Sequence, residues 1–216
     1  MLRGSLLEAN IWILGITQPQ VEVVIFSVPT RMINLVVIPL LLVNTVLPST
    51  ITELYELGNT KQLERTLRVT ATVAGIPAFM VLIVFILFGR QFLFYFFEEF
   101  YIKSYPILVI LSLGQLINVF TGSCGLTLIM ASHEKMMMLS AMISGMITLG
   151  LSLKIAEHYG AIRIAVSVTI GIILYNLSLW LLVRYKTGLW THANISALFL
   201  LIRSMPKAIS RVLISK

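Results

Sequence analysis

Long apolar stretches without charge dominate the pattern of this chain. Five stretches of 18 or more residues contain no Asp, Glu, Lys or Arg, and they cover residues 32–52, 69–89, 104–132, 136–153 and 164–183. A helix needs about 20 mainly apolar residues to cross a hydrocarbon core about 30 Å thick. Strands of a membrane β-barrel would instead show short segments of alternating polarity. The pattern therefore predicts an all-α, polytopic bundle of transmembrane helices.

The boundaries of the stretches predict about five full spans and a shortened N-terminal helix near residues 5–17. Pro29 and Pro39 lie inside the first span and are expected to kink it. An amphipathic segment over 48–68, interrupted by a turn at Gly58 and Asn59, is expected to lie along the membrane surface. The expected spans are about 23–47, 69–89, 106–130, 137–157 and 161–184.

The distribution of Lys and Arg predicts the orientation. If the C-terminus is cytoplasmic, eleven basic residues fall on the cytoplasmic side and five fall elsewhere. Cytoplasmic loops are enriched in Lys and Arg, so the cytoplasmic tail is favoured. Arg203, Lys207 and Arg211 recur at a spacing of four in that tail, which predicts a basic amphipathic helix on anionic lipid. We expect one membrane domain over 1–185 and a tail over 186–216.

Composition agrees with a membrane protein. Of the 216 residues, 58% are hydrophobic and only 12% are charged, whereas a soluble domain carries about 25% charged residues. The net charge of +7 is attributed to the cytoplasmic bias and to anionic lipid, so no nucleic acid partner is expected. The single cysteine, Cys124, allows no intrachain disulfide and is expected to be a small packing residue.

No motif of a known catalytic or metal site occurs. The chain contains no GxxxxGK[ST], HExxH, CxxC or GxSxG pattern, each of which would predict a specific chemistry. His133, His158 and His192 are far apart in sequence. The sequence therefore predicts no enzyme, no metal and no cofactor.

Polar residues inside the spans are the candidates for a binding site, because polar groups in hydrocarbon usually face a cavity or a partner. The candidates are Arg31, Asn34, Gln115 and Asn118. A cavity-facing Arg31 would suit phosphate or acidic sugar through paired hydrogen bonds. Arg31 could equally reach the headgroups or form a structural pair. The amides could line a cavity or join neighbouring helices.

Two segments resemble the polysaccharide flippases of the multidrug/oligosaccharidyl-lipid/polysaccharide exporter superfamily. The segment IFSVPTRMINLVVIPLLLVNTVLPSTITELYELGNTKQLERTLR resembles the eighth helix of these flippases and the cytoplasmic segment after it. The residues that carry this resemblance are Phe26, Ser27, Arg31, Pro48, Gly58 and Asn59.

The second segment, FEEFYIKSYPILVILSLGQLINVFTGSCGLTLIMASHEK, resembles the family's tenth helix and the loop before it. The matching positions are Tyr101, Pro106, Leu111, Gly114, Asn118, Gly122 and Lys135, and Gly160 with Ala161 resembles the entry into the last span. The resemblance extends over roughly residues 5–185. The family has two six-helix lobes, so the chain is expected to correspond to the C-terminal lobe.

The resemblance implies a transporter of the bacterial inner membrane that flips oligosaccharide on undecaprenyl diphosphate for O-antigen, lipopolysaccharide or exopolysaccharide synthesis. It also implies a partner, either a separate N-terminal lobe or a second copy. One alternative is a cation-coupled multidrug exporter of the same superfamily, which would require intramembrane carboxylates. Another is a membrane enzyme of polysaccharide assembly, which would require catalytic carboxylates or His in a larger aqueous loop.

Overall fold

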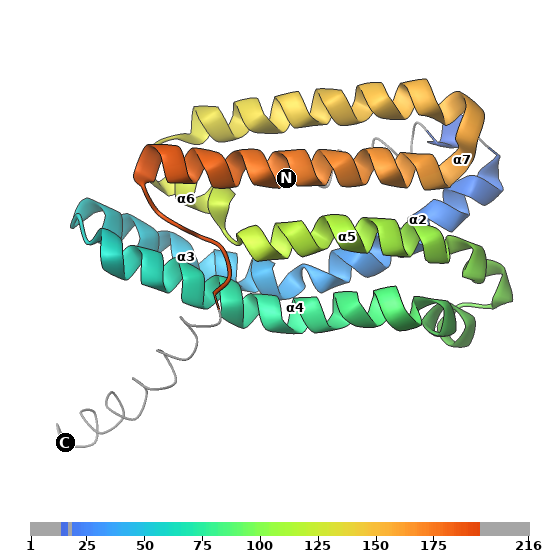
Figure 1. Ribbon diagram of the computed structural model, residues 1–216, viewed down its shortest axis with the longest axis horizontal. Helices are drawn as coiled ribbons and strands as arrows, with labels where there is room; N and C mark the ends of the chain where they lie inside the picture. Colours follow the sequence, from blue (N-terminus) through green and yellow to red (C-terminus); the bar gives the residue numbers. More distant parts are fainter. Residues whose placement is uncertain (1–13, 17–18, 195–216) are drawn as a thin grey trace, which may run out of the picture.

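The described part of the protein is a bundle of antiparallel helices (Figure 1). The computed structural model describes residues 14–16 and 19–194, without the side chains of 155–159. No strand occurs among these residues. The elements are α2 (Gln20–Val36), α3 (Ile38–Glu56), α4 (Thr60–Phe96), η1 (Glu99–Ser104), α5 (Tyr105–Thr121), α6 (Cys124–Met130) and α7 (Glu134–Thr187).

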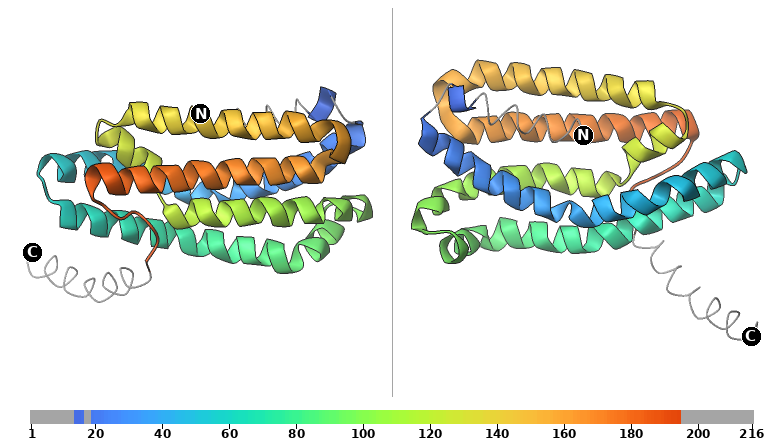
Figure 2. Two further views of the ribbon diagram at one scale, coloured as in Figure 1. Left: turned by 45° about the horizontal axis from the view of Figure 1, so that its top comes forward. Right: turned by 180° about the vertical axis from the view of Figure 1, so that it is seen from behind.

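Within the described residues five helices are long and apolar enough to cross a membrane, so the predicted all-α polytopic bundle is confirmed. They are Ile38–Glu56, Thr60–Phe96, Glu99–Thr121, Glu134–Lys154 and Gly160–Thr187. The chain passes back and forth between two ends of the bundle (Figures 1 and 2). We call them the Gly58 end, where the turns at Gly58, His133 and Gly188 lie, and the Gly160 end, where η1 and Gly160 lie.

The predicted first span is broken near Pro39, one of its two prolines. α2 ends at Val36, and the N–H of Val37 donates to the carbonyl of Asn34 at 3.3 Å. Pro39 follows in the first turn of α3, where its missing N–H costs no helical hydrogen bond. Pro29 remains inside α2. The break therefore lies at Val37, between α2 and α3, and of these two helices Ile38–Glu56 is the one that is long and apolar enough to span a membrane.

The prediction of a surface segment over 48–68 is wrong. α3 continues to Glu56, and α4 begins at Thr60 after a turn in which the side chain of Asn59 accepts a hydrogen bond from the N–H of Gln62 at 3.3 Å. Apolar residues on the two sides of the turn pack against each other in one buried cluster, and they include Leu47, Ile51, Leu54, Leu63 and Leu67. Because this mutual burial removes apolar surface from water, the two arms stay together as a helical hairpin.

Gly160 reverses the direction of the chain within α7. Its φ of 67° and ψ of −171° are accessible to glycine at little cost but not to other residues. Glu22 of α2 accepts a hydrogen bond from the N–H of Ala161 at 2.8 Å, so its carboxylate caps the start of the returning helix. The fourth and fifth spans thus run antiparallel, as the sequence predicts, and α2 is fixed to their connection.

The third span is broken at Gly122, which separates α5 from α6. The last carbonyls of a helix lack partners within the helix. Residues 189–194, which we call the strap, supply partners here. The hydroxyl of Thr191 donates to the carbonyl of Thr121 at 3.0 Å, and the N–H of Ala193 donates to the carbonyl of Phe120 at 2.9 Å.

The strap also contacts α4, where the N–H of Asn194 donates to the hydroxyl of Thr72 at 2.9 Å. The chain after α7 is therefore not helical as far as Asn194 and lies against the bundle. The predicted amphipathic face of Arg203, Lys207 and Arg211 lies outside the described residues, as does most of the predicted N-terminal helix over 5–17.

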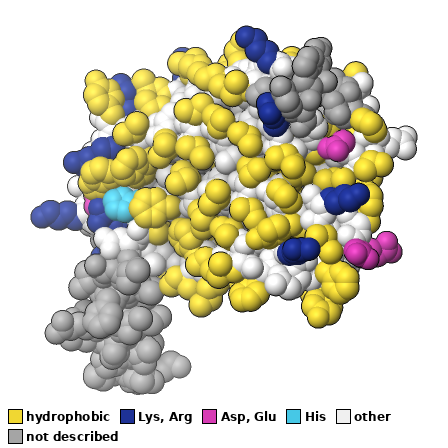
Figure 3. All heavy atoms as spheres, turned by 45° about the vertical axis from the view of Figure 1, so that its right-hand side comes forward, with side chains coloured by type: hydrophobic (Ala, Val, Ile, Leu, Met, Phe, Trp, Pro, Cys, Tyr) yellow, Lys and Arg dark blue, Asp and Glu magenta, His cyan; other side chains and the backbone are white. Residues whose placement is uncertain are grey.

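Apolar side chains fill the interior and also cover the outside. One buried cluster, which includes Phe26, Leu82 and Ile164, lies toward the Gly160 end, and the cluster of the α3–α4 hairpin lies toward the Gly58 end. Large apolar side chains such as Met146 are exposed as well. Figure 3 shows hydrophobic side chains across most of one face, with charged side chains mainly toward its edges. An apolar exterior of this kind is suited to lipid.

Candidate functional site

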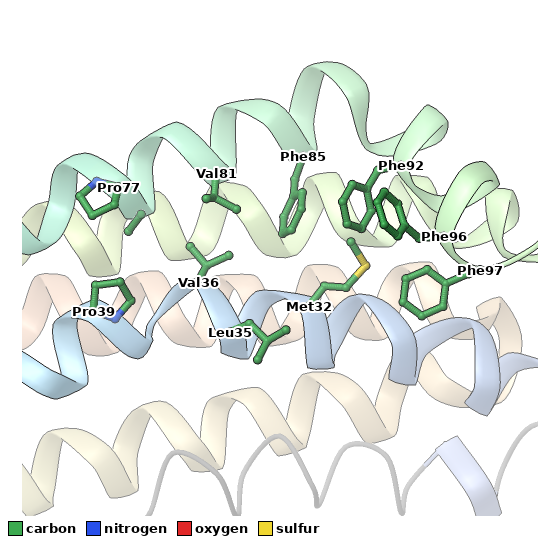
Figure 4. A pocket seen from close by; sticks show the side chains of 11 residues that line it. Met32, Leu35, Val36, Pro39, Pro77, Val81, Phe85, Phe92, Phe96 and Phe97 are labelled. Carbon is green, nitrogen blue, oxygen red and sulfur yellow. The ribbon is translucent and has the colours of Figure 1, made fainter.

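An apolar groove lies between α4 and the broken helix formed by α2 and α3. Its volume is about 510 Å³, and Figure 4 shows the side chains that line it. None of the lining residues is charged or has a polar side chain. They are Met32, Leu35, Val36, Pro39, Pro77, Ala78, Val81, Phe85, Phe92, Phe96 and Phe97.

The two ends of the groove differ. Aromatic rings form one end, where Phe92 stacks on Phe96 with centroids 4.5 Å apart and tilts against Phe85 at 5.6 Å. Figure 4 shows Met32 beside Phe92 and Phe96. These rings belong to the last turns of α4, so this end of the groove lies toward the Gly160 end of the bundle.

The other end of the groove is formed by Pro39 and Pro77, which lie opposite each other (Figure 4). Proline removes a backbone donor and disturbs the helix before it. The break between α2 and α3 lies at the same place. The groove therefore extends along two helices that are both irregular at one of its ends.

Arg31 and Asn34 lie on α2 beside the groove and are exposed. Residues three apart in a helix share a face. Arg31 makes no hydrogen bond or ion pair with any other residue that the structure describes. Its neighbour Met32 lies at the level of Phe92 and Phe96, beyond Arg90 on α4.

Arg31 therefore lies toward the Gly160 end of the bundle, at the level where α4 also becomes charged. At this end the charge-free stretches 32–52 and 69–89 are bounded by Arg31 and Arg90. Such a position agrees with an Arg31 guanidinium at the depth of lipid headgroups, which is one of the alternatives that the sequence leaves open.

Gln115 and Asn118 lie elsewhere, inside the bundle. They are 4% and 2% exposed, and the side-chain N–H of Asn118 donates to the side-chain oxygen Oε1 of Gln115 at 2.8 Å. Close by on α5, the carbonyl of Ile110 accepts from the hydroxyl of Thr169 on α7 at 3.0 Å. Buried polar side chains of this kind stabilise contacts between membrane helices.

The four residues predicted from the sequence thus form two separate pairs. Arg31 and Asn34 are exposed on one helix, Gln115 and Asn118 are buried in α5, and none of the four lines the groove. Their role in substrate binding stays a prediction. Sequence reasoning did not find the groove, although the phenylalanines from Phe92 to Phe97 and the two prolines mark its ends.

Acidic side chains do not gather into a metal site in the part of the chain that the structure describes. No group of three or more His, Cys, Asp or Glu there could hold a metal ion. Glu22, near the start of the predicted first span, caps the returning arm of α7.

A ring cluster at the Gly58 end holds the strap. His192 stacks on Phe120 with centroids 5.7 Å apart and also contacts Trp180 and Trp190. Burial, and to a smaller extent the positive charge of Arg68, lower the pKa of His192 below its ordinary value, while Glu64 opposes the shift. Arg68 and Glu64 form an ion pair at 2.9 Å. The imidazole therefore favours its neutral form.

Comparisons with known proteins add no family. A scan against protein-family models and searches of curated proteins and of solved structures found no match to this chain.

Proposed function

We propose that the protein is a transporter, or the C-terminal half of one, that flips lipid-linked oligosaccharide across the bacterial inner membrane. The observation that carries the proposal is the exposed Arg31 beside a groove with an entirely apolar lining. A glycan on a polyprenyl diphosphate carries phosphate at headgroup depth and hydrocarbon below it. The arrangement of charge and apolar surface therefore matches this class of lipid.

The chemistry required of the protein is recognition without covalent change. The guanidinium of Arg31 can donate two parallel hydrogen bonds to phosphate oxygens. Asn34, one turn further along the same exposed face, can donate to and accept from sugar hydroxyls. The break at Val37 gives α2 and α3 a point about which they can change their angle, as interrupted helices do in transporters.

A partner is part of the proposal. Arg31, Asn34, Leu35 and Ile38 share an exposed face of the broken helix that no other described residue covers. A separate N-terminal lobe or a second copy of the chain would close a cavity over this face. The Gly58 end would be cytoplasmic, and Lys61, Arg65, Arg68, Lys135, Arg184 and Lys186 are its described cations.

Complementation of a flippase-deficient bacterium tests the proposal. Wild-type chain, expressed alone and with a cognate N-terminal lobe, is compared with Arg31→Ala, Arg31→Lys and Asn34→Ala. Lys154→Ala is the matched control, because Lys154 is an exposed cation near the same end on a helix that does not line the groove. A lost charge-assisted hydrogen bond costs about 1.5–3 kcal/mol, so Arg31→Ala should reduce surface glycan about ten- to a hundredfold.

Arg31→Lys should restore only part of the glycan, since a point charge cannot form the paired hydrogen bonds. Lys154→Ala should behave as wild type. Full surface glycan from Arg31→Ala at equal membrane abundance would contradict the role of Arg31. No glycan from the wild-type chain in either setting, despite membrane insertion, would contradict the proposed transport.

A further inference from the structure

We infer that the groove between α2, α3 and α4 is a binding site for the polyprenyl chain of the lipid carrier. This inference rests on the proposed function and specifies where the hydrocarbon part of the substrate lies. It concerns eleven residues that the sequence prediction of Arg31, Asn34, Gln115 and Asn118 does not include.

The lining decides the chemical class of the occupant. A sugar or a headgroup placed in this groove would lose its hydrogen bonds to water, because no lining side chain can replace them. A hydrocarbon chain has no such requirement. The volume of about 510 Å³ lies within the range of about 300–1,000 Å³ that is typical of small-molecule sites.

The groove extends from the Gly160 end toward the middle of the bundle. At about 1.5 Å per residue, its wall on the broken helix rises about 10 Å from Met32 to Pro39, and its wall on α4 rises about 28 Å from Pro77 to Phe96. Half of a hydrocarbon core, about 15 Å, lies between these two lengths. The aromatic end lies toward the charged end of α4, and the prolines lie toward the middle of the bundle. A chain in the groove would therefore extend from headgroup depth toward the bilayer centre.

Charge favours a carrier lipid over ordinary phospholipid. Arg31 directly precedes the lining residue Met32, is exposed, and pairs with no described acid. A diphosphate carries more negative charge than a phosphodiester and attracts a single guanidinium more strongly. The apolar groove and the exposed Arg31 together therefore suit the hydrocarbon chain and the phosphate head of the proposed carrier.

Photolabelling of the full chain in nanodiscs of phosphatidylethanolamine and phosphatidylglycerol tests the inference. The probe is a polyprenyl phosphate with a diazirine in its first isoprene units, and labelled peptides are located by mass spectrometry. We expect labels on Leu35, Val81 and Phe96, reduced at least about fivefold by excess unlabelled polyprenyl phosphate and unchanged by excess phosphatidylglycerol.

Two groove-filling variants give the matched comparison. Val81→Phe places a ring at a lining position that is 40% exposed, and Ala78→Phe fills the buried floor. Because the second change overpacks a buried site and can impair folding, Val81→Phe is the decisive variant. Leu87→Phe is the control, since Leu87 is 62% exposed on the same helix and does not line the groove.

The inference is supported if Val81→Phe abolishes the part of the labelling that unlabelled polyprenyl phosphate reduces, and if Leu87→Phe leaves that labelling intact. It is overturned if phosphatidylglycerol competes equally, if labels spread equally to Met146 on α7, or if Val81→Phe labels like wild type. Complementation separates this inference from the proposed function. If the wild-type chain restores surface glycan but unlabelled polyprenyl phosphate does not reduce labelling of the groove, only the groove inference is refuted. If the groove is labelled but the chain restores no glycan, transport is refuted and the prenyl site is kept.

Discussion

Replacement of Gly122 by alanine should open the contact between the strap and the broken third span. Gly122 has a φ of 72° and a ψ of −145°, a region that is nearly restricted to glycine. A Cβ at this position would lie 2.8 Å from the Cβ of Ala71 and 2.8 Å from the carbonyl oxygen of Thr191. The second neighbour is backbone, so the strap itself must move.

The magnitude follows from two contributions. The backbone conformation costs a non-glycine residue about 1–3 kcal/mol. Displacement of the strap also removes the hydrogen bonds from Thr191 to Thr121 and from Ala193 to Phe120, at about 0.5–1.5 kcal/mol each. Together these give a loss of about 2–6 kcal/mol in stability. Because a local opening of the strap relieves part of the strain, we expect a value in the lower half of that range.

The single cysteine reports the opening directly. Cys124 is 2% exposed, and its sulfur lies 2.9 Å from the hydroxyl of Thr191. A maleimide dye should therefore label it only when the strap opens. A change of 2–4 kcal/mol corresponds to about 30- to 1,000-fold faster labelling at 25 °C, together with a lower thermal midpoint in detergent.

Gly150→Ala is the matched control. Gly150 lies inside α7 and no atom approaches its added Cβ within 4 Å, so alanine should stabilise the helix by up to about 1 kcal/mol. Equal labelling rates for Gly122→Ala and wild type would refute this reasoning. Loss of stability in Gly150→Ala as large as that in Gly122→Ala would also refute it, because the effect would then not depend on the strap.

Three further predictions concern the other contacts between helices. Gly171→Ala should lower stability by about 1–3 kcal/mol, and the thermal midpoint with it, because its Cβ would overlap the hydroxyl of Thr148. The double variant with Thr148→Ala should recover most of the loss. If the effects of the two substitutions simply add, this contact is contradicted. Glu22→Ala should lower the free energy of unfolding by about 0.5–2 kcal/mol, because it removes the carboxylate that caps the N–H of Ala161. Glu99→Ala, at an exposed position, is the control and should be neutral in the same melting experiment. The pKa of His192 is lowered in the folded state, so its contribution to strap stability is present above the unfolded pKa of about 6.5 and is lost as the pH falls below it. His192→Phe should therefore reduce the change in thermal midpoint between pH 7.5 and pH 5.5. An unaltered pH dependence would refute this role of His192.

Local sequence signals were sufficient for much of the fold. Charge-free stretches located five spans, and Gly58 with Asn59 marked the turn between α3 and α4. The amphipathic segment over 48–68 was misplaced because its periodicity fits a membrane surface and a helical hairpin equally well. The hairpin is favoured by distant partners in the same buried cluster, such as Cys124, Leu128 and Leu179, which the local periodicity does not reveal.

The candidate site was only partly predictable for a similar reason. Arg31 stood out as a charge within the predicted first span, and the structure places it on an exposed face of α2. Its role in binding stays a prediction. The groove was not predictable, because its lining combines ordinary apolar residues of α2, α3 and α4 that meet only after packing. The pairing of Gln115 with Asn118 follows from helical spacing, but their burial depends on tertiary structure.

The most direct test of the proposed transport is translocation in vesicles of purified protein. The full chain, alone and with an N-terminal lobe, is reconstituted with fluorescent glycan on undecaprenyl diphosphate, and an impermeant glycosidase reports the glycan that reaches the outer leaflet. The account predicts protein-dependent translocation that Arg31→Ala slows about tenfold or more and Lys154→Ala leaves unchanged. Translocation no faster than in protein-free vesicles, in either combination, would contradict it.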